Sequence, residues 1–455
     1  MPLTSIEIYG FRGFKQRGSL KIAVPNGELG SGLTIITGAN NSGKSSILEC
    51  LRARAGHQPP SFTVGARNPD VEEVEIKFLV NAKIETIRSV RKGSSETTRD
   101  NVDQSFEIFV LPSRRTFNPY FGRGEHTREQ YLNSYPLAPQ RSSMLNGFEQ
   151  RLFTILKNQD EFNSILYELL PSKPEWSIDQ SDQGTYFLKF FNGKHSHSSD
   201  GMGEGIVSIF AIVDSLYDSK PGGVIVIDEP ELSLHPALQK RLAVLLCRFA
   251  KDRQIVVSTH SPYFVDLKSL ASGGHLARVT TGHEGTVIHE ISDASRSSIT
   301  RLSGGNLYNP HVFGLDAREL FFQEDQIILT EGQEDVLLFP KVAEQVEAKI
   351  VGSFFGWGAG GASNIRHLCI ILKDLGYNKV AAILDGDKVE DKDKLIAEFP
   401  NFFFGCIPAK DIRTKPQRKA TEEVQGLLDN KHNVKDEYAE EVRMLLNSLC
   451  EHMSY

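Results

Sequence analysis

Residues 33–51 of the chain, "LTIITGANNSGKSSILECL", carry the pattern that predicts the architecture of the amino-terminal half. An apolar strand over residues 33–37 runs into a glycine-containing loop, and an apolar-periodic helix follows. From Gly38 to Ser45 the loop reads GxxxxGK[ST], the phosphate-binding pattern, between the strand and the helix that this pattern requires. In such a loop the backbone N–H groups and the helix N-terminus surround phosphate oxygens. The stretch therefore predicts a nucleotide-binding α/β domain.

Several side chains of this loop can be given roles in binding ATP. Lys44 is expected to reach the β- and γ-phosphates, and the Ser45 hydroxyl is expected to ligate Mg²⁺. Further nucleotide contacts are expected from the neighbouring positions Gly38, Asn41, Gly43 and Ser46.

Two later strands end in residues suited to the same chemistry. In "VIVIDEPELSLHP" an apolar strand over residues 224–227 leads to Asp228 and Glu229. Asp228 is expected to hold the metal through water, and Glu229 is expected to orient the water that attacks ATP. In "QIVVSTHSP" a strand over residues 255–257 leads to His260, which is expected to sense the γ-phosphate. Buried parallel strands present such residues at their carboxyl ends.

The segment "HSSDGMGEGIVSIFAIVDSL" places Ser199 and Gly201 before an apolar helix that leads into the Asp228 strand. With the phosphate loop, the Asp-Glu strand, "LSLHP" and His260 in this order, it resembles a degenerate signature motif of the ABC-type ATPases. That branch includes the SMC and DNA-repair ATPases. The segment departs from the family in reading "SSDGMGEG" where LSGGQ is usual. The resemblance implies that ATP is held between two copies, that Ser199 and Gly201 contact nucleotide, and that the protein is a homodimer or a higher homo-oligomer.

The rest of the first domain, which we expect to span residues 1–320, is less regular. Residues 71–111 alternate like the antiparallel strands of a first lobe. Helical patterns predict an insertion at about residues 125–175. Arg114 and Arg115 in "LPSRRTF" could contact phosphate or nucleic acid, but a solvated turn is the favoured interpretation.

From residue 323 strands and helices alternate again, which predicts a second α/β domain with a small parallel sheet and right-handed crossovers. "QIILTEGQEDVLLF" carries a strand that ends at Glu331, and "KVAAILDGD" carries one that ends at Asp385 and Asp387. Because the carboxyl ends of neighbouring parallel strands converge on one rim, Glu331 can face these two acids. Divalent cations would offset the repulsion within such a cluster, and carboxylate oxygens favour Mg²⁺ or Mn²⁺.

"EGQED" and "DGD" resemble the acidic motifs of the Toprim domain, and "GGASNI" resembles a glycine turn between them. A Toprim domain behind an ABC-type ATPase is the layout of the OLD (overcoming lysogenization defect) family of ATP-dependent nucleases, so the resemblance spans nearly the whole chain. It implies a metal site formed by four acids: Glu331, Asp335, Asp385 and Asp387. Glu334 is an alternative to Asp335. The lysine of the family is assigned to Lys415, with Lys410 as the second choice, in a basic strip that either grips a phosphate backbone or is a solvated loop.

The expected fold is therefore α/β: an ABC-type P-loop ATPase domain with a mixed sheet and a helical insertion, then a Toprim domain at residues 321–430 and a helical tail at residues 431–455. The expected activity is ATP-dependent or ATP-regulated cleavage of nucleic-acid phosphodiester bonds with Mg²⁺ or Mn²⁺, in bacterial defence against phage. DNA is favoured over RNA as the substrate, and the resemblance implies a defence partner such as a helicase or a reverse transcriptase. The alternative is an ATP-switched sensor or scaffold whose Toprim domain does not cleave.

Composition limits the other classes of protein. A formal net charge of −7 excludes a uniformly basic nucleic-acid coat but permits a local basic groove. The five cysteines are odd in number and form no CxxC pair, so neither a disulfide framework nor a cysteine-rich zinc site is indicated. No apolar run approaches the ~20 residues that cross a bilayer, and the first residues lack the features of a signal peptide, so we expect a cytoplasmic protein without a membrane partner.

Overall fold

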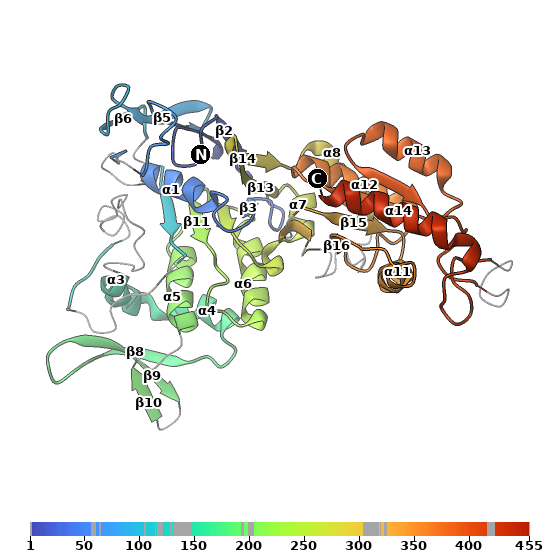
Figure 1. Ribbon diagram of the computed structural model, residues 1–455. Coiled ribbons are helices and arrows are strands. Elements are labelled where there is room, and N and C mark those ends of the chain that lie inside the picture. Colours follow the sequence, from blue (N-terminus) through green and yellow to red (C-terminus); the bar gives the residue numbers. More distant parts are fainter. Residues whose placement is uncertain are drawn as a thin grey trace. The chain divides into compact units, whose positions relative to one another are not determined.

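The computed structural model describes residues 2–55, 61–62, 65–103, 106–113, 115, 122–127, 130, 148–192, 195–198, 204–303, 318, 320–322, 325–415 and 424–454. The chain forms two compact units, Met1–Glu290 and Ile291–Tyr455, which are described one at a time (Figure 1). Among the described residues, none of the helices is both long and apolar enough to span a bilayer.

A six-stranded mixed sheet forms the centre of the first unit and carries the phosphate loop. Its strands in spatial order are β14 (Gly285–Glu290), β13 (His275–Gly282), β3 (Leu33–Thr37), β12 (Gln254–Ser258), β11 (Val224–Asp228) and β7 (Ile108–Leu111). Every pairing is parallel except that of β13 with β14. Strands β3, β11 and β12 are buried at every position, and strands buried on both faces read as largely apolar runs. The strands predicted at residues 33–37, 224–227 and 255–257 are therefore confirmed.

Helices connect the strands of this sheet. They are α1 (Lys44–Ala55) after β3, α5 (Glu204–Tyr217) before β11, α6 (Pro236–Phe249) after β11, and η3 (Pro262–Phe264) with α7 (Leu267–Ala271) after β12. Helix α1 shares a core with the central sheet and with a five-stranded antiparallel sheet, through residues such as Ile36, Ile47 and Phe78. The antiparallel sheet consists of β2 (Gly18–Lys21), β1 (Leu3–Tyr9), β4 (Glu75–Val80), β5 (Lys83–Ser89) and β6 (Thr97–Asp100).

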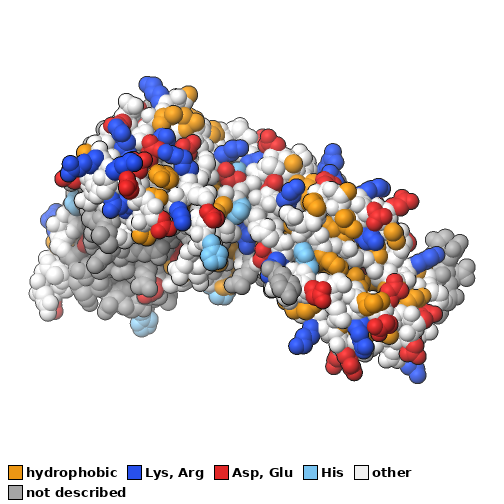
Figure 2. Space-filling model, turned by 45° about the horizontal axis from the view of Figure 1, so that its top comes forward, with side chains coloured by type: hydrophobic (Ala, Val, Ile, Leu, Met, Phe, Trp, Pro, Cys, Tyr) orange, Lys and Arg blue, Asp and Glu red, His pale blue; other side chains and the backbone are white. Residues whose placement is uncertain are grey.

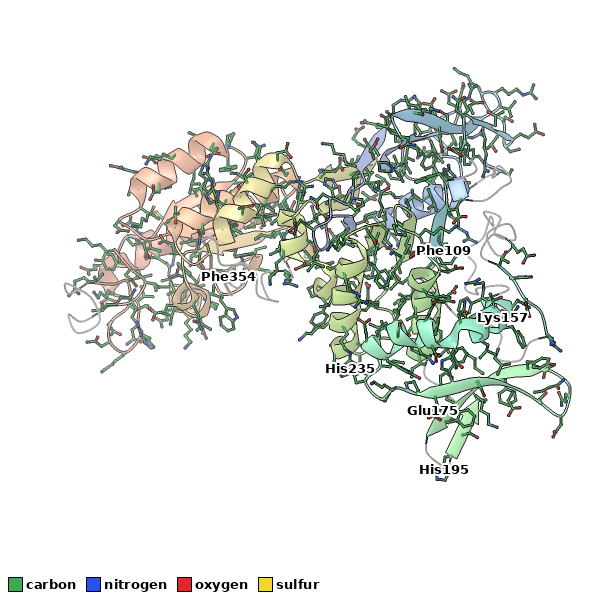
Figure 3. All side chains as sticks on the ribbon, turned by 180° about the vertical axis from the view of Figure 1, so that it is seen from behind. Phe109, Lys157, Glu175, His195, His235 and Phe354 are labelled. Carbon is green, nitrogen blue, oxygen red and sulfur yellow. The ribbon has the colours of Figure 1, made fainter. Side chains whose placement is uncertain are left out.

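Strand β7 departs from the expectation of antiparallel strands over residues 71–111. Strands β4, β5 and β6 pair antiparallel as predicted, but β7 pairs in parallel with β11 at the edge of the central sheet. All four residues of β7 are buried, including Phe109, which is labelled in Figure 3. The sequence "IFVL" is apolar throughout, which is compatible with a strand that is buried on both faces.

The segment before α5 combines helices with a small sheet. Helices α3 (Phe148–Ile155), η1 (Leu156–Asn158) and α4 (Gln159–Leu169) are followed by the antiparallel strands β8 (Glu175–Gln180), β9 (Tyr186–Asn192) and β10 (His195–Ser198). An aromatic cluster attaches this segment to α5, since Trp176 lies 5.7 Å from Phe162 and 5.1 Å from Phe210 between ring centroids. These helices lie within the range of the expected insertion, whose bounds stay a prediction, and the three-stranded sheet follows them.

The second unit is built on a four-stranded parallel sheet, as predicted. Its strands in spatial order are β16 (Ser353–Phe354), β15 (Ile327–Thr330), β17 (Val380–Leu384) and β18 (Phe403–Cys406). All three pairings are parallel. The helices are α8 (Asp293–Ser303), η4 (Leu320–Phe322), α11 (Gln333–Gln345), α12 (Ala362–Asp374), α13 (Val389–Glu398) and α14 (Asp436–Ser454).

Helices α8 and α14 lie within the second unit rather than at its margins. Helix α14 buries Val442, Leu446, Leu449 and Met453 in the same core as β15 and β17, so it packs within this unit. Helix α8 packs on α12, and Asp374 accepts hydrogen bonds from Ser292 and Ser295 at the start of α8. The second compact unit thus begins at Ile291. The limits of the functional domains, expected at 320/321 and 430/431, stay predictions.

Candidate nucleotide and metal sites

The phosphate loop is fixed against the β13–β14 hairpin. Gly38 and Gly43 have φ angles of +140° and +109°, a region that favours glycine. A Cβ on Gly38 would lie 2.2 Å from the Val279 carbonyl oxygen, and a Cβ on Gly43 would lie 2.8 Å from Thr286 Cγ2. Asn41 has a φ of +62°, which asparagine tolerates better than most residues. The loop is therefore tightly curved and has no room for a side chain at either glycine, as a cradle of backbone N–H groups requires.

Lys44 begins α1 inside this loop. Its side chain is buried, and Nζ donates hydrogen bonds of 2.9 Å each to the carbonyl oxygens of Gly38 and Ala39. The ammonium group is therefore held by the start of the same loop whose backbone N–H groups are expected to bind phosphate. Ser45 is half-buried and Ser46 is buried in the first turn of the same helix.

Asp228, Glu229 and His260 follow the neighbouring strands β11 and β12. A hydrogen bond from the Ser258 hydroxyl to Asp228 Oδ1 joins the two strand ends, and His260 Nε2 lies 3.8 Å from Glu229 Oε1. Burial lowers the pKa of His260, the positive charge of Lys44 lowers it further, and Asp228 opposes the shift. The structure thus brings together the loop lysine, the two acids and the histidine, although they come from three separate motifs.

Glu231 is a further residue of this site that sequence motifs do not reveal. Its carboxylate accepts the backbone N–H of His260 at 2.6 Å and the hydroxyl of Thr259 at 2.8 Å. Burial raises the pKa of Glu231, although these hydrogen bonds oppose the shift. The Glu231 side chain therefore fixes the backbone at Thr259 and His260. In the sequence, Glu231 is visible only as a third acid in "DEPEL", and such an acid by itself is typical of a solvated loop.

Arg115 is buried, so the interpretation of its position as a solvated turn is wrong. Only 2% of its surface is exposed, because the guanidinium lies beneath the backbone of Asp228 and Glu229. Arg114 and two signature residues, Ser199 and Gly201, lie outside the described residues.

In the second unit, carboxylates gather at the carboxyl ends of β15 and β17. The backbone N–H of Asp385 donates to Glu331 Oε1 at 3.0 Å, which joins the two strand ends. Burial, followed by the negative charges of Glu331 and Asp335, raises the pKa of Asp385 to about 8. Burial raises the pKa of Asp335 to about 6, although Asp335 Oδ2 accepts the Gly332 N–H at 2.9 Å. Glu331 and Asp385 therefore meet at one rim, as parallel strands allow.

Asp387 belongs to the same rim but is more exposed. Its charge adds to the raised pKa values of Glu331 and Asp385, while its own side chain is 49% exposed and lies 3.3 Å from Lys388 Nζ. The other acids after β17 lie in α13, where those of the first turn complement the positive helix N-terminus.

The rim has the donor groups of a divalent-cation site but not yet their arrangement. Among the described residues, no three His, Cys, Asp or Glu side chains are grouped closely enough to hold a metal ion as they stand. The donor chemistry nevertheless fits, because carboxylates with raised pKa values gain when a cation offsets their repulsion and desolvation. Ligation by all four acids would require side chains such as Glu331 and Asp387 to turn toward a common point.

Lys415 is held beside this rim by an acid that the sequence alone does not single out. It forms an ion pair with Asp411, and the charge of Asp411 contributes to the raised pKa values of Asp335 and Asp385. Lys410, the second choice for the family's lysine, is exposed. Asp411 is the only acid within the basic strip "KDIRTKPQRK". That position is the one sequence signal for its role, and the basic residues around it make a solvated charge the simpler interpretation.

Glu334, the alternative to Asp335, makes a different contact. Its carboxylate accepts a hydrogen bond of 2.6 Å from Arg413, whereas Asp335 is buried and is influenced by the charge of Glu331. The basic strip therefore contacts α11 through Arg413, and the charge of Lys415 lies near enough to Asp385 to interact with it. Over the described side chains in view, Figure 2 shows acidic and basic groups intermixed without a broad basic face.

Two family models match the chain. The first, described as "AAA domain, putative AbiEii toxin, Type IV TA system", matches residues 120–266 and so includes Asp228, Glu229 and His260. The second, described as "Overcoming lysogenization defect protein-like, TOPRIM domain", matches residues 321–387 and includes all four acids of the rim. The matched order, an AAA domain followed by an OLD-like TOPRIM domain, agrees with the expected order of an ATPase domain and a Toprim domain. The phosphate loop, Asp411 and Lys415 lie beyond the matched residues.

Similarity to individual proteins is more limited. The chain is 23% identical over 278 residues to the Septu protein PtuA of Bacillus thuringiensis, a match that covers 52% of this chain and 68% of that protein. It is 43% identical over 75 residues to the OLD nuclease of Thermus scotoductus, which covers 15% of this chain and 14% of that nuclease. Among solved structures, the SMC head domain from Thermotoga maritima is 16% identical with a TM-score of 0.39, covering 64% of this chain and 100% of that domain.

Proposed function

We propose that the protein is an ATP-regulated, divalent-metal-dependent nuclease that cleaves nucleic-acid phosphodiester bonds. The observation that supports this most directly is the rim of the second unit, where Glu331 and Asp385 meet and several carboxyl groups have raised pKa values. The match to an OLD-like Toprim model over these same residues supports it independently.

In the first unit, ATP would be held by the phosphate loop. Lys44 would contact the β- and γ-phosphates, and Ser45 and Asp228 would hold the accompanying cation. Glu229 would orient the attacking water, and His260, whose backbone is fixed by Glu231, would contact the γ-phosphate. The signature segment, with Ser199 and Gly201, would complete the site of a second copy in a homodimer.

In the second unit, Glu331, Asp335, Asp385 and Asp387 would hold Mg²⁺ or Mn²⁺. When bound, such cations supply Lewis acidity at the phosphate and activate water for attack. Lys415, oriented by Asp411, would stabilise negative charge that develops during cleavage. Arg413 and Lys415 would hold the phosphate backbone beside the rim.

The biological setting belongs to the same proposal. Similarity to an OLD nuclease and to a Septu protein supports a role in bacterial defence against phage. The proposed substrate is DNA rather than RNA. A helicase or reverse transcriptase would be the kind of partner expected in that setting.

The direct test is cleavage of supercoiled plasmid by the purified full chain with Mg²⁺ or Mn²⁺, with and without ATP. We expect wild-type protein to nick the plasmid, and Asp385→Asn to lose at least about 100-fold in rate because a ligand is removed. Asp393→Asn is the matched control, since Asp393 is 67% exposed on the nearby α13. The Asp385 variant should still hydrolyse ATP, whereas Glu229→Gln should bind ATP without hydrolysing it.

A second candidate is an ATP-switched sensor or scaffold whose Toprim domain does not cleave. The observation in its favour is that the described acids do not form a ready-made group of three ligands. Under this alternative, wild-type protein would hydrolyse ATP but leave plasmid, single-stranded DNA and RNA intact with either cation. Nicking that depends on Asp385 would exclude it.

A further inference from the structure

The Arg115 guanidinium is surrounded by oxygen acceptors from three parts of the first unit. Nε donates to the Ser208 hydroxyl of α5 at 2.7 Å. One terminal nitrogen donates to the carbonyl oxygens of Pro112 at 2.8 Å and Asp228 at 2.7 Å, and the other donates to the carbonyl oxygen of Glu229 at 2.9 Å. The planar guanidinium can hold several acceptors in a fixed arrangement, which a lysine cannot reproduce.

The contact at Glu229 falls on a strained backbone. Glu229 has a φ of +47°, a conformation that is unfavourable for a residue with a Cβ and is found mainly where the surroundings enforce it. Its N–H donates to the carbonyl oxygen of Ser258 at 2.9 Å. With Arg115 holding the carbonyl groups of Asp228 and Glu229, the peptide groups on both sides of the Glu229 Cα are fixed. These contacts therefore fix the direction in which the Glu229 side chain leaves the backbone.

The contact at Ser208 joins the same guanidinium to α5. This helix begins at Glu204, directly after the signature segment. Its first turn also approaches the loop after Glu229 directly, since a Cβ on Gly205 would lie 2.4 Å from the Ser233 carbonyl oxygen and the Ser233 hydroxyl donates to Glu204 at 3.2 Å. The start of α5 and the acid-bearing loop are thus connected twice, once directly and once through Arg115.

We propose that Arg115 is a positioning residue of the ATPase site, which fixes the Glu229 carboxylate and makes its direction depend on the placement of α5. The inference rests on the proposed function, because it assumes that Glu229 orients the attacking water. Arg115 itself would touch neither ATP nor water.

The test compares variants that break different parts of this connection. Arg115→Lys keeps the charge but loses the fork of donors, and Ser208→Ala removes only the contact with α5. The matched control is Ser215→Ala, because Ser215 is buried in the same helix but its hydroxyl donates to the carbonyl oxygen of Ile212 at 2.6 Å. For each full-length variant, kcat and KM for ATP, the Kd of a fluorescent ATP analogue and the melting temperature would be measured.

We expect Arg115→Lys and Arg115→Ala to lower kcat by about 100-fold while KM and Kd stay within about threefold, since misplacing a catalytic group affects chemistry more than binding. Ser208→Ala should lower kcat by about threefold to tenfold, in proportion to one lost hydrogen bond. Ser215→Ala should behave like wild type. If Arg115→Ala does not fold, the lysine and serine variants decide the question.

Two outcomes would overturn the inference. One is a wild-type kcat in both Arg115→Lys and Ser208→Ala, and the other is a loss confined to KM, Kd and melting temperature, which would indicate a purely structural role. Glu229→Gln separates this inference from the proposed function. If that variant is inactive while the Arg115 and Ser208 variants match wild type, only the inference fails; if it hydrolyses ATP normally, or if wild type does not hydrolyse ATP, both fail.

Discussion

At the level of single residues, Lys415 is a cation that forms an ion pair beside the acidic rim of the second unit. Its partner Asp411 contributes to the raised pKa of Asp385, so the lysine charge lies near the carboxylates that would hold the cations. We expect Lys415→Ala to lower the single-turnover rate of plasmid nicking by roughly 100-fold to 1000-fold, because a charge that stabilises the transition state is removed. Lys410→Ala, at an exposed position of the same strip, should leave the rate within about twofold. Equal effects, or a larger effect at Lys410, would argue against the assignment.

Glu75 provides a test of pH dependence away from both sites. It lies 2.5 Å from Arg17 and 3.2 Å from Lys77. Burial acts to raise the pKa of Glu75, but hydrogen bonds from the two cations outweigh it and lower the pKa below the ordinary value of 4.5. The ionised carboxylate therefore adds stability above pH 4.5, and this contribution disappears as the pH falls through the lowered pKa.

The expected size of this effect is small because the group is partly solvated. Glu75→Gln should lower the free energy of unfolding by about 0.5 kcal/mol at neutral pH. The difference between the two proteins should vanish at an acidic pH below the lowered pKa of Glu75. Urea unfolding at both pH values measures it, and a difference that persists unchanged in acid would show that the ion pairs are not its source.

Which site residues can be predicted depends on where their partners lie in the sequence. Lys44, Asp228 and Asp385 stand in short motifs next to the strands that place them, so the sequence is sufficient. Arg115 and Glu231 gain their roles from backbone groups that are distant in sequence or that belong to another strand end. Such partners become neighbours only when the sheet has formed, and the residues by themselves resemble solvated charges.

At the level of elements, burial on both faces made the central strands predictable. β3, β11, β12, β15 and β17 are short apolar runs followed by polar residues, and no other element type fits that pattern well. β7 shows the limit, because a four-residue apolar run does not reveal which of two sheets it joins. The sheet of β8, β9 and β10 and the docking of α14 were likewise decided by tertiary packing, which no local pattern encodes.

Helix α14 should contribute to the stability of the second unit. Leu446 is fully buried in its core, whereas Met444 on the same helix is 55% exposed. We expect Leu446→Ala to lower the free energy of unfolding of this unit by about 2–5 kcal/mol through loss of burial and formation of a cavity. Met444→Ala should change it by no more than about 0.5 kcal/mol. Denaturant unfolding of the two full-length variants compares them, and similar losses would contradict the packing of α14.

For the whole molecule, the order of the ATPase motifs leads us to expect that two copies of the chain form a dimer. If ATP is held between two copies, a variant that binds but does not hydrolyse it should accumulate as a dimer. We expect Glu229→Gln with ATP and Mg²⁺ to show the mass of two chains by size-exclusion chromatography with light scattering. Lys44→Ala, which should bind ATP weakly, serves as the control and should not respond to ATP. A single-chain mass for Glu229→Gln at saturating ATP would contradict a nucleotide-held dimer.

The central claim is that acids from β15 and β17 act together as a cation site. Calorimetric titration of Mn²⁺ into the nucleotide-free full chain tests it most directly, with wild type, Asp385→Asn and the exposed control Asp393→Asn measured side by side. We expect wild type and Asp393→Asn to take up Mn²⁺ equally and Asp385→Asn to lose that uptake. Uptake by Asp385→Asn equal to that of wild type, or none by wild type, would contradict the claim.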